Sequence, residues 1–305
     1  MTTEPEVIEV EGAAGTLRAL CWSSSEVRDR DRPIALLLHG FPDAPETWVP
    51  TAQRLADDGW RVVAPYLRGY APSDLASDGS YHVGALMDDA LRVVDELGPT
   101  DHDVVIGHDW GAIIAGVLAS LPDNPFRKAV LMSVPPIPVF YPIRGLGVRR
   151  SLPVLLPKQL LRSWYITYFQ LPSLPERSSG KVIPFLWRRW SVRRDIDLTP
   201  VYDAIGAPDR WTAAISYYRC AASDKSVPQR YRAYQDRFGE PPQIPVLYLH
   251  GDRDGALGVG FADRARAVLP PGSAAHVIEG AGHFLQVDSP EETIEKITGF
   301  IGPVD

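Results

Sequence analysis

Residues 103–111 read DVVIGHDWG and lead directly into the apolar stretch AIIAGVLASL at 112–121. The first stretch has the pattern of a short buried strand, and the second has the composition of a buried helix. Between them, Gly107 and Gly111 flank a sharp turn that presents the side chain of Asp109. A strand, a tight turn and a helix in this order predict a nucleophile turn in an α/β protein. The competing interpretation is a surface aspartate that only caps the following helix.

A similar alternation of strands and helices extends outward from this turn. Strands are expected near residues 6–10, 16–22, 34–38, 61–65, 103–107, 128–132, 244–251 and 274–280, and two late helices near 259–269 and 290–301. IALLL at 34–38 and the strand before Asp109 are continuously apolar, which is typical of parallel strands covered on both faces. The sequence therefore predicts the α/β class, with a mostly parallel central sheet flanked by helices.

Residues 137–240 have a different character. They read as helices separated by prolines, rich in aromatic residues and arginine, with no convincing strand. We therefore expect a core of residues 1–136 and 241–305 with an inserted helical lid at 137–240. The lid has 17 Lys and Arg against 8 Asp and Glu, an excess of +9, so the net charge of −7 leaves −16 for the core. This asymmetry indicates two differently charged surfaces rather than two functions.

The overall composition excludes several classes of protein. A chain of 305 residues with 45% apolar composition should fold as a globular protein, and its acidic balance gives no reason to expect nucleic-acid binding. No apolar run approaches the roughly 20 residues that span a bilayer. The first thirty residues show no secretory signal, so a cytoplasmic location is expected by default. Cys21 and Cys220 have no metal-site spacing and are expected to be reduced thiols.

A carboxylate at the turn points to a particular chemistry. Asp109 is an anion at neutral pH, so it needs no base to activate it and can attack a saturated carbon to form an alkyl ester. Turnover then requires water and a general base. The best candidate for the base is His283, in the small-residue loop GAGHF at 280–284, and an acidic partner is expected from Asp254 or Asp252 after the strand IPVLYLHG.

Three motifs together carry a family resemblance. The loop His39-Gly40-Phe41-Pro42, the turn GHDWGA at 107–112 and the loop at 280–284 resemble those of the α/β-hydrolase superfamily, and within it the epoxide hydrolases. The resemblance implies the α/β-hydrolase fold and the chain order nucleophile, acid, histidine. Its spacing selects Asp254, with Asp252 as the alternative. It also implies that the peptide N–H groups of Phe41 and Trp110 form an oxyanion hole.

The lid is expected to supply the acid that assists ring opening. WYITYFQLP at 164–172 resembles the first lid tyrosine motif of the family and gives Tyr165; ISYYRC at 215–220 resembles the second and gives Tyr218. A phenol, with an ordinary pKa of about 10, suits donation to a ring oxygen. Tyr168 and Tyr217 remain alternatives, because each is a near neighbour in the chain. An apolar substrate slot is expected from four aromatic residues, namely Phe41, Trp110, Trp164 and Phe169.

The resemblance implies an epoxide hydrolase that converts an epoxide and water into a vicinal diol through an ester on Asp109. It implies no cofactor and no metal, and a homo-oligomer is compatible with the sequence. A haloalkane dehalogenase would share Asp109, Trp110, Asp254 and His283, but would not need two tyrosines and often has a donor side chain where Phe41 stands. A catalytically silent hydrolase fold that binds a small ligand is a third alternative.

Overall fold

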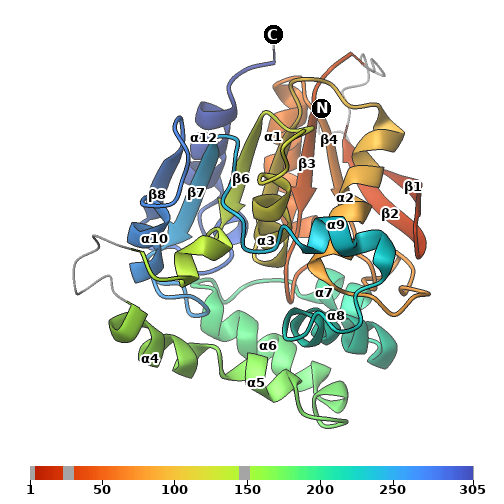
Figure 1. The fold of residues 1–305 in the computed structure, drawn as a ribbon, viewed down its shortest axis with the longest axis vertical. Coiled ribbons are helices and arrows are strands. Elements are labelled where there is room, and N and C mark those ends of the chain that lie inside the picture. The colour runs from red at the N-terminus through yellow and green to blue at the C-terminus, as the bar shows by residue number, and fades with distance from the viewer. Residues whose placement is uncertain (1–3, 23–30, 144–151, 305) are drawn as a thin grey trace.

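Eight strands form one sheet in the computed structural model, which describes residues 4–22, 31–143 and 152–304 (Figure 1). The strands are β1 (Glu6–Gly12), β2 (Gly15–Trp22), β3 (Ile34–Leu38), β4 (Arg61–Pro65), β5 (Val104–His108), β6 (Lys128–Met132), β7 (Val246–Gly251) and β8 (Ala274–Ile278). Their order in the sheet is β1-β2-β4-β3-β5-β6-β7-β8. The antiparallel pairs are β1 with β2 and β2 with β4, and every other pair is parallel. The predicted mostly parallel sheet is confirmed.

The centre of the sheet is covered on both faces by helices. α2 (Val83–Leu97) and α3 (Trp110–Leu118) lie on one face, and α1 (Val49–Asp57) and α12 (Pro290–Ile301) on the other. Strands β3 and β5 consequently have every residue buried, as their uninterrupted apolar sequences require. The late helix expected at 259–269 is shorter in the structure, where α10 runs from Gly260 to Ala265.

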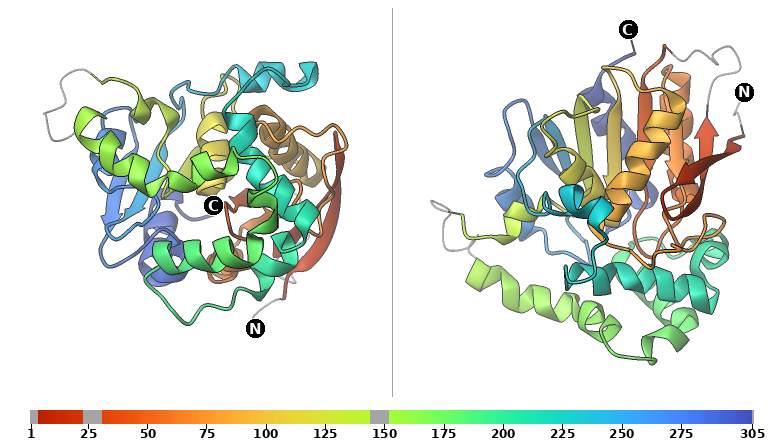
Figure 2. Two further views of the ribbon diagram at one scale, coloured as in Figure 1. Left: turned by 90° about the horizontal axis from the view of Figure 1, so that it is seen from below. Right: turned by 45° about the vertical axis from the view of Figure 1, so that its right-hand side comes forward.

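Between β6 and β7 the chain forms helices only, as far as the structure describes residues 137–240, and we keep the name lid for this segment. Its α-helices are α4 (Leu152–Arg162), α5 (Trp164–Phe169), α6 (Ser179–Trp190), α7 (Thr199–Ile205), α8 (Pro208–Ala221) and α9 (Arg232–Gln235). Helices α4 to α8 lie together at one end of the sheet, with α4 and α5 outermost (Figures 1 and 2). The division into two domains remains a prediction.

No described helix is both long enough and apolar enough to span a bilayer. The lid residues 144–151, which include three of the arginines counted in the sequence, lie outside the described residues.

Candidate active site

Asp109 occupies a strained turn between β5 and α3. Its backbone angles, φ 51° and ψ −114°, lie in a region that L-residues rarely adopt. The flanking glycines make the turn possible, because a Cβ atom on Gly107 would lie 2.0 Å from the carbonyl oxygen of Gly111. A Cβ atom on Gly111 would lie 2.0 Å from the carbonyl oxygen of Leu38. The expected sharp turn between a strand and a helix is thus present, and it holds Asp109 at the sheet end that the lid covers.

The two carboxylate oxygens of Asp109 have different partners. The peptide N–H of Phe41 donates to Oδ1 at 2.8 Å, whereas Oδ2 lies 3.3 Å from Nε2 of His283. Trp110 is the first residue of α3, so its N–H has no acceptor within the helix. Gly40 lets the Phe41 loop approach, because a Cβ there would lie 2.4 Å from the Cβ of Asp109. Oδ1 is therefore held by a peptide N–H, whereas Oδ2 faces the histidine.

His283 is paired with Asp254 on its other side. Nδ1 of the ring lies 2.8 Å from Oδ2 of Asp254, and both side chains are almost completely buried. The second oxygen of Asp254 accepts the N–H groups of Ala256 and Leu257 at 2.7 and 2.9 Å. Asp252 is exposed and instead accepts the N–H of Gly280. Of the two acids left open by the sequence, the structure therefore places Asp254 against the histidine.

The two carboxylates control the charge of His283. Burial by itself disfavours the imidazolium, but the negative charges of Asp254 and Asp109, with hydrogen bonds from both, outweigh it and raise the pKa of His283 to about 10. Asp254 is also fully buried, yet its pairing with His283 lowers its pKa. The arrangement at neutral pH is therefore a cation between two anions.

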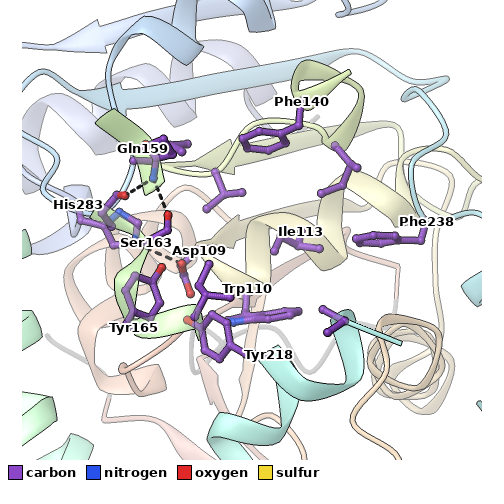
Figure 3. A pocket seen from close by; sticks show the side chains of 17 residues that line it. Asp109, Trp110, Ile113, Phe140, Gln159, Ser163, Tyr165, Tyr218, Phe238 and His283 are labelled. Atoms are coloured by element: carbon purple, nitrogen blue, oxygen red, sulfur yellow. Dashed lines mark hydrogen bonds and ion pairs between the residues drawn. The ribbon is translucent and has the colours of Figure 1, made fainter. Parts of the chain in front are cut away.

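Tyr165 and Tyr218 lie beside Asp109, although they come from different lid helices. Both are buried, their ring centroids are 5.6 Å apart, and both line the same cavity as Asp109. Figure 3 shows the two side chains reaching toward Asp109, with His283 approaching from another direction. Burial raises the pKa of both phenols, so each hydroxyl carries its proton. Among the described residues, the buried Oη of Tyr218 finds no hydrogen-bond partner.

The two alternative tyrosines have other surroundings. Tyr217 is buried behind the site, where its hydroxyl donates to the carbonyl oxygen of Arg68 at 2.8 Å. Tyr168 lies on the outer part of α5, and its hydroxyl is 3.5 Å from the carbonyl oxygen of Leu174. Neither residue lines the cavity beside Asp109. The structure therefore favours Tyr165 and Tyr218 as the pair that faces Asp109.

The cavity above Asp109 has a volume of about 330 Å³ and is lined mainly by apolar side chains. Its lining residues are Asp109, Trp110, Ile113, Val134, Ile137, Phe140, Gln159, Ser163, Tyr165, Ile166, Tyr218, Ala221, Ala222, Phe238, Ala256, Leu257 and His283. Figure 3 shows the labelled polar side chains gathered around Asp109, with Phe140 and Phe238 at the other side of the cavity. A small, largely apolar molecule with one reactive polar group fits this distribution.

The predicted aromatic slot is only partly correct. Trp110 lines the cavity, but the other three residues do not. The rings of Phe41 and Phe169 are fully buried behind Tyr218, with centroids 5.2 and 5.3 Å from its ring. Trp164 is 38% exposed, because its position next to Tyr165 on α5 turns it about 100° away around the helix. These three residues support or flank the site and do not form its walls.

Sequence reasoning missed Gln159 of helix α4. Its side-chain N–H₂ donates to the carbonyl oxygen of Ala256 at 2.7 Å, and its oxygen accepts the N–H of Gly258 at 3.0 Å. The neighbouring Arg162 donates to the carbonyl oxygen of Asp254 at 2.9 Å. Helix α4 is thereby tied to the loop that carries Asp254. No sequence motif marks these contacts, because the partners of Gln159 lie about a hundred residues away.

The described residues contain no group of three or more His, Cys, Asp or Glu side chains arranged to bind a metal ion.

Comparison with known proteins agrees with the fold. A family model described as the alpha/beta hydrolase fold matches residues 33–290. The AB hydrolase superfamily protein YfhM of Bacillus subtilis is 31% identical over 85% of this chain and 87% of its own. Epoxide hydrolase A of Mycobacterium tuberculosis is 25% identical over 90% of this chain and 92% of its own. The solved structure of an epoxide hydrolase from an endophytic Streptomyces has a TM-score of 0.75 at 23% identity, covering 98% of this chain and 96% of that one.

Proposed function

The chain belongs to the α/β-hydrolase fold family, and we propose that it hydrolyses epoxides to vicinal diols through a covalent ester on Asp109. One observation carries the proposal: a buried carboxylate at a nucleophile turn faces a histidine–aspartate pair and two protonated phenols. A carboxylate suits attack on a saturated carbon, and the phenols suit an oxygen leaving group. Similarity to proteins named epoxide hydrolases in Mycobacterium tuberculosis and Mus musculus, at 25% and 29% identity, supports the same substrate class.

The first half-reaction opens the ring. Oδ2 of Asp109 attacks a ring carbon, and the bond between that carbon and the ring oxygen breaks. Tyr165 and Tyr218 hold the oxygen, and one of them gives it a proton. The cationic His283 then restores the phenol proton, through water or directly. The products of this step are a hydroxyalkyl ester, two neutral phenols and a neutral imidazole.

The second half-reaction cleaves the ester. Neutral His283 accepts a proton from water as the water oxygen attacks Cγ of Asp109, and Asp254 stabilises the imidazolium. The oxyanion forms at Oδ1, where the N–H of Phe41 already donates, and the adjacent N–H of Trp110 is the second donor. The bond between Cγ and Oδ2 then breaks, and the alkyl group leaves with Oδ2. The proton of the new carboxyl group moves to Oδ2, which becomes a hydroxyl of the diol. Asp109 is again an anion and His283 again a cation, so the cycle closes.

The proposal is tested by a single turnover of styrene oxide in oxygen-18 water. In His283→Gln, ring opening should proceed and ester hydrolysis should fail, so mass spectrometry should find an adduct on the peptide that contains Asp109. In the wild type, repeated turnovers should place heavy oxygen in that carboxylate, because the water oxygen stays on Cγ. His102→Gln is the matched control, since His102 is exposed and distant from the site; it should behave as the wild type.

Two results would contradict the proposal. Diol formation without any label in Asp109 would exclude the covalent ester. Halide release from a haloalkane, with no diol from any epoxide, would instead indicate the haloalkane dehalogenase that the sequence left open. Two phenols at the leaving-group side favour the epoxide, because an alkoxide needs a proton and a halide does not.

A further inference from the structure

Large exposed apolar side chains gather on one part of the lid. Of the fourteen such residues in the described structure, nine fall between residues 154 and 185. They are Val154, Leu156, Leu160, Leu161, Trp164, Ile166, Leu171, Leu174 and Phe185. Single exposed apolar side chains are ordinary on protein surfaces, but a cluster of this kind marks a surface that contacts something apolar.

The cluster spans three helices on the outer side of the lid. Leu160 and Leu161, at the end of α4, are 71% and 78% exposed. Trp164 follows on α5, and its ring centroid lies 5.9 Å from that of Phe185 on α6. Figure 2 shows α4 and α5 on the surface that faces away from the sheet. We refer to Leu160, Leu161, Trp164 and Phe185 as the lid patch.

Positive charge lies beside the lid patch, on α6 and in the cleft next to it. Between residues 152 and 190 there are six Lys and Arg, and the one acidic residue, Glu176, is paired with Arg219. On α6, Lys181, Phe185 and Arg188 are spaced four and three residues apart, so they share an exposed face. A cleft of about 540 Å³ adjoins this face. Its cations are Lys181, Arg188, Arg194 and Arg193, the last of which is paired with Asp195.

A second copy of the chain does not match this surface well. Two lid patches placed against each other would bring two basic surfaces together. A lid patch placed against the acidic core would bring opposite charges together. The core, however, offers few apolar partners: residues 4–136 and 241–304, where described, have only three scattered large exposed apolar side chains, Val7, Leu75 and Val259. An anionic lipid bilayer offers both negative headgroups and an apolar layer just beneath them.

We propose that the lid patch and its surrounding cations dock the protein on the surface of an anionic lipid membrane. Leu160, Leu161, Trp164 and Phe185 enter the boundary between headgroups and acyl chains, while Lys181 and Arg188 contact lipid phosphates. The docking surface adjoins the active-site cavity, because Ile166 is both exposed on α5 and part of the cavity lining. If the proposed function also holds, an apolar epoxide dissolved in the membrane would enter the cavity from this side.

The experiment measures binding of the full chain to sedimented vesicles. Vesicles of phosphatidylcholine alone are compared with vesicles that also contain phosphatidylglycerol, at low and high salt. We expect binding to the anionic vesicles only, weakened by salt because the charge contacts are exposed. Leu160→Ser with Leu161→Ser, and separately Lys181→Gln with Arg188→Gln, should each weaken it by about tenfold or more.

The matched control is Val7→Ser with Leu75→Ser, which removes two exposed apolar side chains from the core and should leave binding unchanged. Equal loss in this control, or no binding of the wild type to anionic vesicles, would overturn the proposal. Another result would assign the patch to a second copy of the chain. In that case the wild type would be a dimer that does not bind vesicles, and Leu160→Ser with Leu161→Ser would make it a monomer. Hydrolysis of a water-soluble epoxide is assayed separately, so the docking result does not depend on the proposed reaction.

Discussion

Nε2 of His283 lies 3.3 Å from Oδ2 of Asp109, so the proposed base and the proposed nucleophile interact directly before any substrate binds. This contact couples the two half-reactions. While Asp109 is ionised, it helps to hold His283 as a cation that cannot act as a base. Ester formation removes both the charge and the hydrogen bond. The histidine should therefore become basic enough to activate water only after the ester has formed.

Asp109→Asn tests this coupling, because the amide is neutral like the ester and has nearly the same shape. The pKa of His283, raised to about 10 in the free enzyme, should fall by about 1 to 3 in this variant. Nitrogen-15 NMR titration of the imidazole measures it. Asp252→Asn, which removes an exposed carboxylate outside the site, should leave the value unchanged. A pKa still near 10 in Asp109→Asn would mean that Asp254 alone sets it.

The same coupling predicts how the rate of ester hydrolysis changes with pH. The reaction needs neutral His283, so the rate of ester breakdown should rise with pH and level off above the pKa of His283 in the ester. That pKa should lie below the value of about 10 for the free enzyme. Rapid quenching at a series of pH values gives the profile. A rate that falls as pH rises would show that the cationic form is the one required.

Tyr165→Phe and Tyr218→Phe should each slow ring opening. Removing one donor to a developing oxyanion reduces rates by about 10²-fold or more in comparable sites. Stopped-flow fluorescence under single-turnover conditions can follow the step, since Trp110 is next to Asp109 in the chain and lines the same cavity. Tyr168→Phe is the control, because Tyr168 does not line the cavity. Unchanged ring opening in both variants, with slower ester hydrolysis instead, would remove the tyrosines from this role.

Loss of the hydroxyl should change the free energy of unfolding in opposite directions at Tyr217 and Tyr218. Oη of Tyr218 is buried and bonds to none of the residues that the structure describes, so Tyr218→Phe should raise the free energy of unfolding by about 1 kcal/mol while it lowers activity. Oη of Tyr217 donates to the carbonyl oxygen of Arg68, so Tyr217→Phe should lower that free energy by about 1 kcal/mol. Urea unfolding compares the two. A destabilised Tyr218→Phe would indicate that its hydroxyl is satisfied in solution.

Sequence alone predicts the parts of the candidate site that depend on short stretches of chain. The turn around Asp109 and the loop around His283 are recognisable because a few adjacent residues impose their shape. The choice between Tyr165 and Tyr168 was different, because residues three apart lie near one face of a helix and only packing decides which one points inward. Trp164 does not line the cavity for a different reason. Adjacent positions on a helix point in directions about 100° apart, so a cavity-facing Tyr165 turns Trp164 away.

Contacts between the lid and the core were beyond sequence reasoning, and Gln159 is the clearest case. Its two hydrogen bonds, to Ala256 and Gly258, hold α4 against the loop of Asp254. Gln159→Leu has a similar volume but loses both bonds, so the loop and the His283–Asp254 pair should be less well fixed. We expect ester hydrolysis to slow by about tenfold while ring opening changes little, because Asp109 is held by other residues.

Gln229→Leu is the matched control for that variant, since Gln229 is an exposed lid glutamine that does not line the cavity. Single-turnover kinetics with one epoxide separates the two rates in both variants. The ester should accumulate in Gln159→Leu and not in Gln229→Leu. Equal slowing of ring opening and ester hydrolysis would instead assign Gln159 to substrate binding through the cavity wall, because that loss would affect both steps alike.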